Sequence, residues 1–260
     1  EKAAGDLSEA EKDLLAAKDL YESLYGEDHP DAARIYSGLG NLLAEKGALN
    51  EAEGYLRRAY LIRVKLFGRE HPVAVKSVLD LGRLLAEQGD FSGAEEAYQT
   101  ALENRTRKFG ENHPQTAAVW QQMAGLYIEE GAVSKAAACI QRAYPVYLDS
   151  YGSRHDRVAA LLVQKGSLST IAGDLSAAEE NYLKAKDIYE SLHGRQDKNV
   201  SLVWNNLAAL YDKQGRAACS EKAYLQALSI YRALYGQKHP AIAAVLNNLG
   251  TLYFGMSDWK

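Results

Sequence analysis

Residues 204–211 read WNNLAALY, and the spacing of their apolar members decides the fold. Trp204, Leu207 and Tyr211 stand at i, i+3 and i+7, which places them on one face of an α-helix. Residues 246–253 repeat the pattern as LNNLGTLY, 42 positions later. Stretches of about 16 residues with this spacing fill the chain, so the sequence predicts an all-α protein without strands.

Two series of glycines mark a 42-residue repeat along the whole chain. The first series is Gly5, Gly47, Gly89, Gly131, Gly173 and Gly215, and the second is Gly26, Gly68, Gly110, Gly152, Gly194 and Gly236. The segments between them predict two antiparallel helices in each repeat, here named A and B. We expect A helices at about 30–46, 72–88, 114–130, 156–172, 198–214 and 240–256, and B helices at about 6–24, 50–66, 92–108, 134–150, 176–192 and 218–234.

The second glycine series lies in loops that run from an aromatic residue to a His-Pro pair, as from Tyr25 to Pro30. The loops at 67–72, 109–114 and 235–240 have the same form. Because the first turn of a helix does not use the N–H group that proline lacks, four of the five prolines predict the start of an A helix. Pro145 instead falls inside a B helix, which it should kink or shorten.

The histidines follow the same repeat. They are His29, His71, His113, His155 and His239, at one loop position, and His193, where the loop aromatic belongs. Equivalent side chains in successive repeats lie roughly 16–20 Å apart, two helix spacings, whereas a metal needs its ligands at about 2 Å. We therefore expect these histidines to cap the loops, and we predict no metal site.

Polar residues after the first glycine series predict capped B helices. Ser or Asn stands three positions after the glycine and Glu three positions later, which is the spacing of a capping box. The predicted N-caps are Ser8, Asn50, Ser92, Ser134 and Ser176, and their partners are Glu11, Glu53, Glu95 and Glu179.

Small residues also recur at the predicted crossing of helices A and B. They are Gly40, Gly82, Ala124, Gly166, Ala208 and Gly250 on helix A, and Ala17, Ala59, Ala101, Ala143, Ala185 and Ala227 on helix B.

The motifs WxxLAxxY at 204–211 and WxxMAxxY at 120–127 resemble the tetratricopeptide repeat (TPR). The 42-residue length, the aromatic-to-His-Pro loop and LNNLGTLY are similar to the kinesin light chain type of this repeat. The resemblance implies a right-handed α-solenoid, a superhelix of antiparallel helix pairs, as a single domain over residues 1–260. Its units would be about 1–26, 27–68, 69–110, 111–152, 153–194, 195–236 and a partial 237–260. Lys165 and Ser169 replace the expected Leu and Tyr, so repeat 4 should pack less well.

Composition excludes several classes of partner. The 30 Lys and Arg residues against 34 Asp and Glu give a net charge of −4, without the basic surplus that nucleic-acid binding requires. No apolar run reaches the roughly 18 residues of a membrane helix, and Cys139 and Cys219 suit free thiols in a reducing compartment. We therefore expect a cytoplasmic protein that binds neither nucleic acid nor membrane. Catalytic motifs and phosphate-binding loops are absent, so the sequence predicts no enzyme and no cofactor.

The candidate binding residues are polar side chains on the inner face of helix A. From the third repeat onward the middle inward position is Gln or Asn, whose carboxamide can both donate to and accept from the main chain of an extended peptide. Arg34, Lys76 and Arg83 in the first two repeats form a basic patch, only partly offset by Asp80, which suits an acidic segment or a carboxylate terminus. The peptide-binding candidates are Arg34, Asn41, Lys76, Arg83, Gln121, Gln122, Gln164, Asn205, Asn206, Asn247 and Asn248. The kinesin light chain resemblance implies peptide contact for only four of them: Asn205, Asn206, Asn247 and Asn248.

The sequence thus favours an adaptor or scaffold whose inner groove binds an extended, mildly acidic segment of a partner protein. Two alternatives stay open. The polar residues could be the solvated face of a structural spacer or sensor region, and the open terminal helices could mediate self-association. Because the chain lacks an initiator Met and ends within a repeat, we expect it to be a piece of a longer protein. Enzymatic activity would require a catalytic domain in the flanking sequence.

Overall fold

The computed structural model describes residues 2–257, with side chains from residue 7 to residue 256. Its twelve elements are all α-helices, as the hydrophobic spacing predicts. The B helices are α1 (Lys2–Tyr25), α3 (Leu49–Phe67), α5 (Phe91–Phe109), α7 (Val133–Tyr151), α9 (Leu175–His193) and α11 (Ala217–Tyr235). The A helices are α2 (Pro30–Glu45), α4 (Pro72–Glu87), α6 (Pro114–Glu130), α8 (Asp156–Ala172), α10 (Lys198–Lys213) and α12 (Pro240–Ser257). The predicted bounds are confirmed to within about a residue except in α1, which runs through Gly5.

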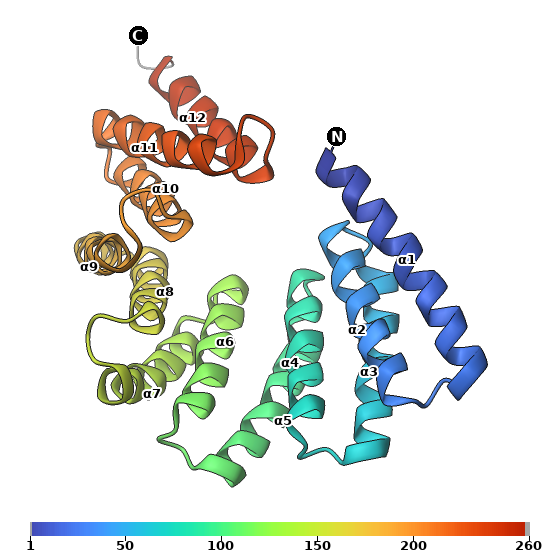
Figure 1. Cartoon of the computed structure of the whole chain (residues 1–260). Coiled ribbons are helices and arrows are strands. Elements are labelled where there is room, and N and C mark those ends of the chain that lie inside the picture. Colours follow the sequence, from blue (N-terminus) through green and yellow to red (C-terminus); the bar gives the residue numbers. More distant parts are fainter. Residues whose placement is uncertain (1, 258–260) are drawn as a thin grey trace. The chain divides into compact units, whose positions relative to one another are not determined.

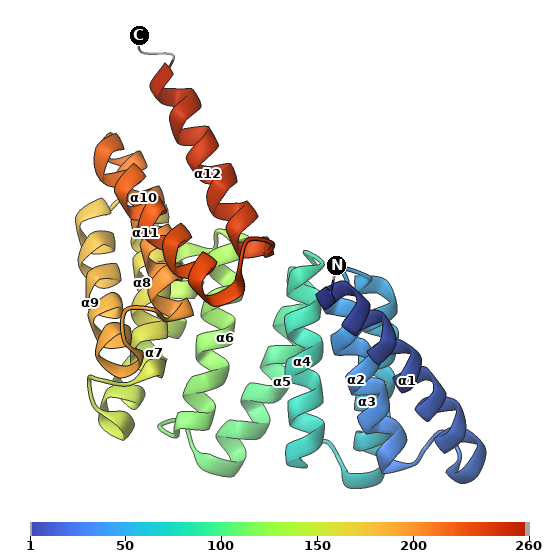
Figure 2. The same ribbon diagram turned by 45° about the horizontal axis from the view of Figure 1, so that its top comes forward.

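The chain forms two compact units, Glu1–Leu126 and Tyr127–Lys260, and the boundary between them lies inside α6. Within the first unit α1 to α5 pack in chain order, each helix against the next (Figure 1). Within the second unit α7 to α12 do the same, and α8 to α11 lie side by side (Figure 2). Each unit is therefore built of stacked helix pairs.

The A and B helices of a pair cross at the predicted small residues. A Cβ atom on Gly82 would lie 2.8 Å from Cε1 of Tyr98, and one on Gly166 would lie 2.6 Å from Cε1 of Tyr182. The equivalent alanines of the B helices are fully buried: Ala59, Ala101, Ala143, Ala185 and Ala227. The close crossing is confirmed at these repeats, whereas a Cβ on Gly250 would meet no atom within 4 Å.

The loop histidines cap the A helices, as predicted. In five loops the histidine Nδ1 accepts the backbone N–H two residues further on; these are His29, His71, His113, His155 and His239. Each of these rings also stacks on the aromatic residue that opens its loop, with ring centroids 4.2 Å apart for Tyr151 and His155. In the remaining loop Asp197 takes the capping place and accepts the N–H of Asn199 at 2.7 Å.

The predicted capping boxes of the B helices are wrong. Apart from α1, these helices start at half-buried apolar residues such as Leu49 and Leu175, so Asn50, Ser92, Ser134 and Ser176 are the second residues of their helices, whereas Ser8 is the seventh residue of α1. The observed N-caps are Ala48, Asp90, Ala132, Asp174 and Arg216. Two of the predicted Glu partners, Glu53 and Glu179, instead accept hydrogen bonds from Gln88 and Gln214 at the end of the next A helix.

Two predicted defects are milder than expected. Helix α7 has the same 19 residues as its equivalents, so Pro145 does not shorten it. Pro145 and Gln141 are both exposed, so water can bond the Gln141 carbonyl that lacks an N–H partner. In repeat 4, Lys165 is exposed and its ammonium lies 5.6 Å from the ring centroid of Tyr144. That repeat loses one core side chain, while its Leu161 stays fully buried.

Candidate peptide-binding faces

The predicted binding residues are all at least partly exposed on A helices, but the structure distributes them over two units. The first unit carries Arg34 and Asn41 on α2, Lys76 and Arg83 on α4, and Gln121 and Gln122 on α6. The second unit carries Gln164 on α8, Asn205 and Asn206 on α10, and Asn247 and Asn248 on α12. Each unit therefore presents its own candidate face.

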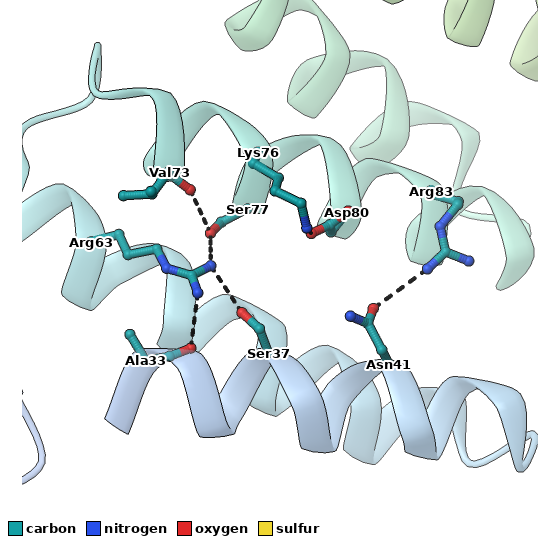
Figure 3. A network of polar contacts seen from close by, with 9 residues as sticks. All are labelled: Ala33, Ser37, Asn41, Arg63, Val73, Lys76, Ser77, Asp80 and Arg83. Carbon is teal, nitrogen blue, oxygen red and sulfur yellow. Dashed lines mark hydrogen bonds and ion pairs between the residues drawn. The ribbon is translucent and has the colours of Figure 1, made fainter. Parts of the chain in front are cut away.

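In the first unit a groove lies between α2 and α4. It encloses about 370 Å³ and is lined by Asn41, Ala44 and Glu45 of α2 and by Asp80, Arg83 and Glu87 of α4. An Nη2 group of Arg83 reaches Oδ1 of Asn41 at 3.5 Å across this groove (Figure 3). Two of the predicted residues, 42 positions apart, thus meet in this α2–α4 groove.

The predicted basic patch is not basic in the structure, because every cation in it lies beside a carboxylate. Lys76 pairs with Asp80 at 3.0 Å and Arg83 pairs with Glu87 at 2.7 Å, both at i,i+4 spacing. Arg34 pairs with Asp31 at 3.5 Å. Glu45 adds a further negative charge to the wall of the groove. The carboxylates therefore outnumber the predicted cations, and the expectation of a basic surface is wrong.

Sequence reasoning missed Arg63, which comes from the B helix α3 and inserts between α2 and α4 (Figure 3). Its guanidinium donates to the hydroxyl oxygens of Ser37 and Ser77, at 2.9 Å for Ser37, and to the main-chain oxygen of Ala33 at 3.3 Å. The Ser77 hydroxyl in turn donates to the oxygen of Val73. Burial lowers the pKa of Arg63, and the charge of Asp80 offsets this effect only in part. Arg63 thus ties the two walls of the groove together.

One sequence signal could have identified Arg63. The equivalent positions in the six repeats are Tyr21, Arg63, Arg105, Tyr147, Tyr189 and Tyr231. Two repeats have arginine where the other four have tyrosine, and a guanidinium at such a position indicates a polar contact. In repeat 3, Arg105 makes such a contact, to Oε1 of Gln115 at 2.5 Å.

In the second unit carboxamides of neighbouring A helices meet. Nδ2 of Asn248 on α12 donates to Oδ1 of Asn205 on α10 at 3.3 Å. Helix α10 contacts both α8 and α12, so Gln164, Asn206 and Asn248 lie on adjacent A helices. Asn206 is half-buried and makes no side-chain hydrogen bond within residues 7–256. Its carboxamide can therefore donate to and accept from an incoming main chain.

A cluster at the other end of α10 joins successive repeats. Glu179 on α9 accepts hydrogen bonds from Gln214 and from Arg216, the latter at 2.9 Å. Burial alone would raise the pKa of Glu179, but bonds from Gln214, Arg216 and Tyr211 outweigh burial and lower it. Burial, with the bond to Glu179, raises the pKa of Tyr211 to about 12. This cluster fixes α10 against α9 and so positions the face that carries Asn206.

In the described part of the chain no three His, Cys, Asp or Glu side chains form a group that could hold a metal ion. None of its helices combines the length and the apolar character needed to span a bilayer.

The fold and the repeat motifs have counterparts among known proteins. A family model described as tetratricopeptide repeat matches residues 1–63, 38–107, 75–149 and 199–260. No curated protein matches the chain. Solved structures do, among them BtubC (BKLC) from P. vanneervenii, with 21% identity, a TM-score of 0.67, and coverage of 90% of this chain and 92% of that one.

Two further structures have the same fold. The nearly identical TPR-like repeats of a putative kinesin light chain from Podosopora anserina share 19% identity, with a TM-score of 0.61, and cover 80% of this chain and 99% of theirs. TTC0263, a thermophilic TPR protein in Thermus thermophilus, shares 18% identity, with a TM-score of 0.59, and covers 86% and 100%. Together, the matching family model, the 42-residue helix pairs and the capped loops establish that the chain belongs to the tetratricopeptide repeat family.

Proposed function

We propose that the chain is an adaptor or scaffold module whose A-helix faces bind extended segments of a partner protein. Tetratricopeptide repeats are generally protein-interaction modules, and stacked helix pairs offer extended binding surfaces. The observation that carries the proposal is Asn206, whose half-buried carboxamide has no hydrogen-bond partner within residues 7–256. A peptide main chain offers this solvent-accessible carboxamide both an acceptor and a donor.

The mechanism is preorganisation. Asn205 is held by Asn248, and α10 is held against α9 by Gln214 and Arg216, so Asn205, Asn248 and the backbone of α10 lose little freedom on binding. The partner segment then bears most of the ordering cost. A buried hydrogen bond lost from such a complex costs about 1–3 kcal/mol, because the group left behind stays unpaired.

The first unit has no surplus of positive charge at this face, so an acidic segment would bind there only by displacing Asp80 and Glu87 from Lys76 and Arg83. Exposed ion pairs at i,i+4 spacing contribute only about 0.3–0.5 kcal/mol to stability, so replacing one carboxylate partner by another costs little free energy. Replacing Asp80 with Asn would free the Lys76 ammonium at little structural cost. If the segment is acidic, Asp80→Asn should tighten its binding, most strongly at low salt; weaker or unchanged binding would contradict the acidic assignment.

The experiment that tests the proposal compares pull-downs from a cell extract by the wild-type chain, by the Asn206→Ala/Asn248→Ala variant and by Gln226→Ala. Gln226 is an exposed carboxamide on the B helix α11 of the same unit, so it is a matched control. We expect mass spectrometry to identify proteins that the wild type and Gln226→Ala retain and the double variant loses. Identical sets for all three chains would contradict the A-helix face as the binding site.

Self-association is a second candidate, favoured by the apolar surface of α12. Phe254 is 71% exposed and Tyr253 and Leu246 are each 45% exposed. Leu20 and Leu24 of α1 are likewise exposed. Light scattering on the 260-residue chain tests this candidate: a mass that rises with concentration, and that falls in Phe254→Ser, supports it, whereas a constant monomer mass excludes it.

A further inference from the structure

The A-helix face that carries the candidate residues differs in charge between the two units. Positions spaced i, i+4, i+7 and i+11 share one face of a helix; they begin at residues 34 and 76 in the first unit and at residues 160, 202 and 244 in the second. On α2 and α4 six of these eight positions are charged: Arg34, Glu45, Lys76, Asp80, Arg83 and Glu87. On α8, α10 and α12 eleven of the twelve are uncharged, and the exception, Lys213, is the last residue of α10. The second unit therefore presents a nearly uncharged A-helix face.

Two large apolar side chains are exposed on this face. Leu202 on α10 is 43% exposed and Ile171 on α8 is 47% exposed. In the first two repeats the position of Leu202 carries Arg34 and Lys76, and the position of Ile171 carries Glu45 and Glu87. Helices α7 and α9 pack on α8, and α9 and α11 pack on α10. Neither side chain is therefore exposed because a neighbouring helix is missing.

Carboxamides lie beside these apolar side chains. Asn206 is one turn from Leu202 on α10, about 6 Å along the helix axis, and Gln164 is two turns from Ile171 on α8. Asn206 is half-buried and makes no side-chain hydrogen bond within residues 7–256. The face thus combines groups that can bind a main chain with apolar surface next to them.

We propose that the segment bound by the second unit is extended and uncharged, and that it places one apolar side chain on Leu202 and another on Ile171. This inference rests on the proposed function, since it names the chemistry of the partner at the same A-helix face. Away from Lys213, a charged group of the partner would lose water on this face without gaining a counter-ion, which costs more than burying an uncharged group. An apolar side chain instead removes the exposed area of Leu202 or Ile171 from water.

This chemistry predicts that salt affects the two units differently. The charges on α2 and α4 make binding to the first unit sensitive to salt, because ions screen exposed charges beyond about 10 Å at about 0.1 M. An uncharged segment on α8, α10 and α12 gains nothing from such charges. Its affinity should therefore change less than about twofold between about 50 and about 500 mM NaCl.

The test is a selection from phage-displayed random peptides of about 12 residues, which extend over about 40 Å. The library is first depleted on the Leu202→Lys/Ile171→Glu variant, so that peptides bound elsewhere on the chain are removed, and is then selected on the wild-type 260-residue chain. Both substitutions introduce residues that another repeat carries at the same position, Lys76 and Glu87, so the variant should fold. We expect the selected peptides to lack Asp, Glu, Lys and Arg and to contain at least two apolar residues.

A selected peptide is then synthesised and titrated by fluorescence anisotropy. Leu202→Lys should weaken its binding at least about tenfold. Leu192→Lys is the matched control, because Leu192 is 42% exposed on the B helix α9 and the equivalent position on α5 carries Lys108. This control should bind the peptide as the wild type does.

The outcomes separate this inference from the proposed function. Selected peptides that are acidic or basic, with an affinity that falls as salt rises, would contradict the uncharged assignment and leave the A-helix face as the binding site. An empty selection would also overturn the inference, because no peptide would then depend on Leu202 and Ile171. Equal affinity of a selected peptide for the wild type and for Asn206→Ala/Asn248→Ala would instead contradict the proposed function.

Discussion

Asn248 donates its Nδ2 group to Oδ1 of Asn205 at 3.3 Å, which links α12 to α10 through side chains 43 positions apart. The bond uses one donor of Asn248 and one acceptor position of Asn205, and each carboxamide keeps further hydrogen-bonding capacity. The bond thereby orients both carboxamides and leaves further donors and acceptors of each available. A face built in this way can bind a main chain and is itself held in place by the fold.

Replacing glycine by alanine inside a helix usually stabilises a protein. The close crossing of α4 and α5 predicts the opposite effect at Gly82. Gly82→Ala should destabilise the protein by about 1–3 kcal/mol, because its Cβ would lie 2.8 Å from Cε1 of Tyr98. Gly54→Ala, in the interior of α3 with no atom within 4 Å of its Cβ, should stabilise it by about 0.5–1 kcal/mol. Urea unfolding of the two variants beside the wild type measures both, and a Gly82→Ala variant as stable as Gly54→Ala would refute the close crossing.

Arg63 is predicted to matter more for stability than its exposure suggests. Arg63→Ala removes the donor shared by Ser37, Ser77 and the Ala33 carbonyl, so we expect a loss of about 1–3 kcal/mol in the free energy of unfolding. Arg57→Ala, on the same helix with an exposed i,i+4 partner, should change it by less than about 0.5 kcal/mol. Equal losses for the two variants in denaturant unfolding would show that Arg63 does not hold α2 and α4 together.

The N-cap of α8, His155, can be tested against the Asp that caps α10 at the equivalent position. His155→Ala removes both the bond from its Nδ1 to the N–H of Arg157 and the ring stacked on Tyr151, and should cost about 1 kcal/mol. His155→Asp should restore most of this loss, because Asp197 caps α10 at the equivalent position. Thermal unfolding of the two variants decides the matter: if the Asp variant is no more stable than the Ala variant, the cap is not what His155 contributes.

His193 predicts a pH dependence of stability. The bond from His193 to Oδ1 of Asp156 at 2.6 Å raises the pKa of His193 above its ordinary 6.5. A raised pKa in the folded state means that this pair stabilises the protein fully below pH 6.5 and progressively less as the pH rises through the folded-state value. The difference in unfolding free energy between wild type and His193→Gln should therefore be largest below pH 6.5 and shrink as the pH rises above that value. A difference that stays constant or grows over this range would exclude the ion pair.

Much of the fold could be predicted from the sequence, because the same local sequence signals recur in each of the six repeats. The glycine series, the prolines and the apolar spacing determine the helix bounds locally, and small residues such as Gly82 and Gly166 mark the crossings. The N-caps of the B helices could not be predicted, because half-buried apolar residues such as Leu49 and Leu175 draw the helix start outward. Asp90 and Asp174 also cap their helices through their side chains, so at these two helices the preceding Asp, and not the predicted Ser, is the N-cap.

The candidate site was only partly predictable for a similar reason. Residue types on helix A identified Asn41 and Arg83, which do meet across the α2–α4 groove. The sequence reasoning counted Asp80 as a partial offset of the patch but not the pairs of Arg34 with Asp31 and of Arg83 with Glu87, so it overestimated the positive charge of that surface. Arg63 enters from a different helix, so a reading of the A helices alone could not include it.

The most direct test of the central claim, that A-helix carboxamides bind a partner's main chain, is an affinity measurement with a synthetic segment. Peptides tiled over a protein retained in the pull-down would be titrated by fluorescence anisotropy against the wild type, Asn206→Ala/Asn248→Ala and Gln226→Ala. The account predicts a Kd at least tenfold weaker for the double variant, with unchanged unfolding behaviour, and no change for Gln226→Ala. An unaltered Kd in a folded double variant would contradict it.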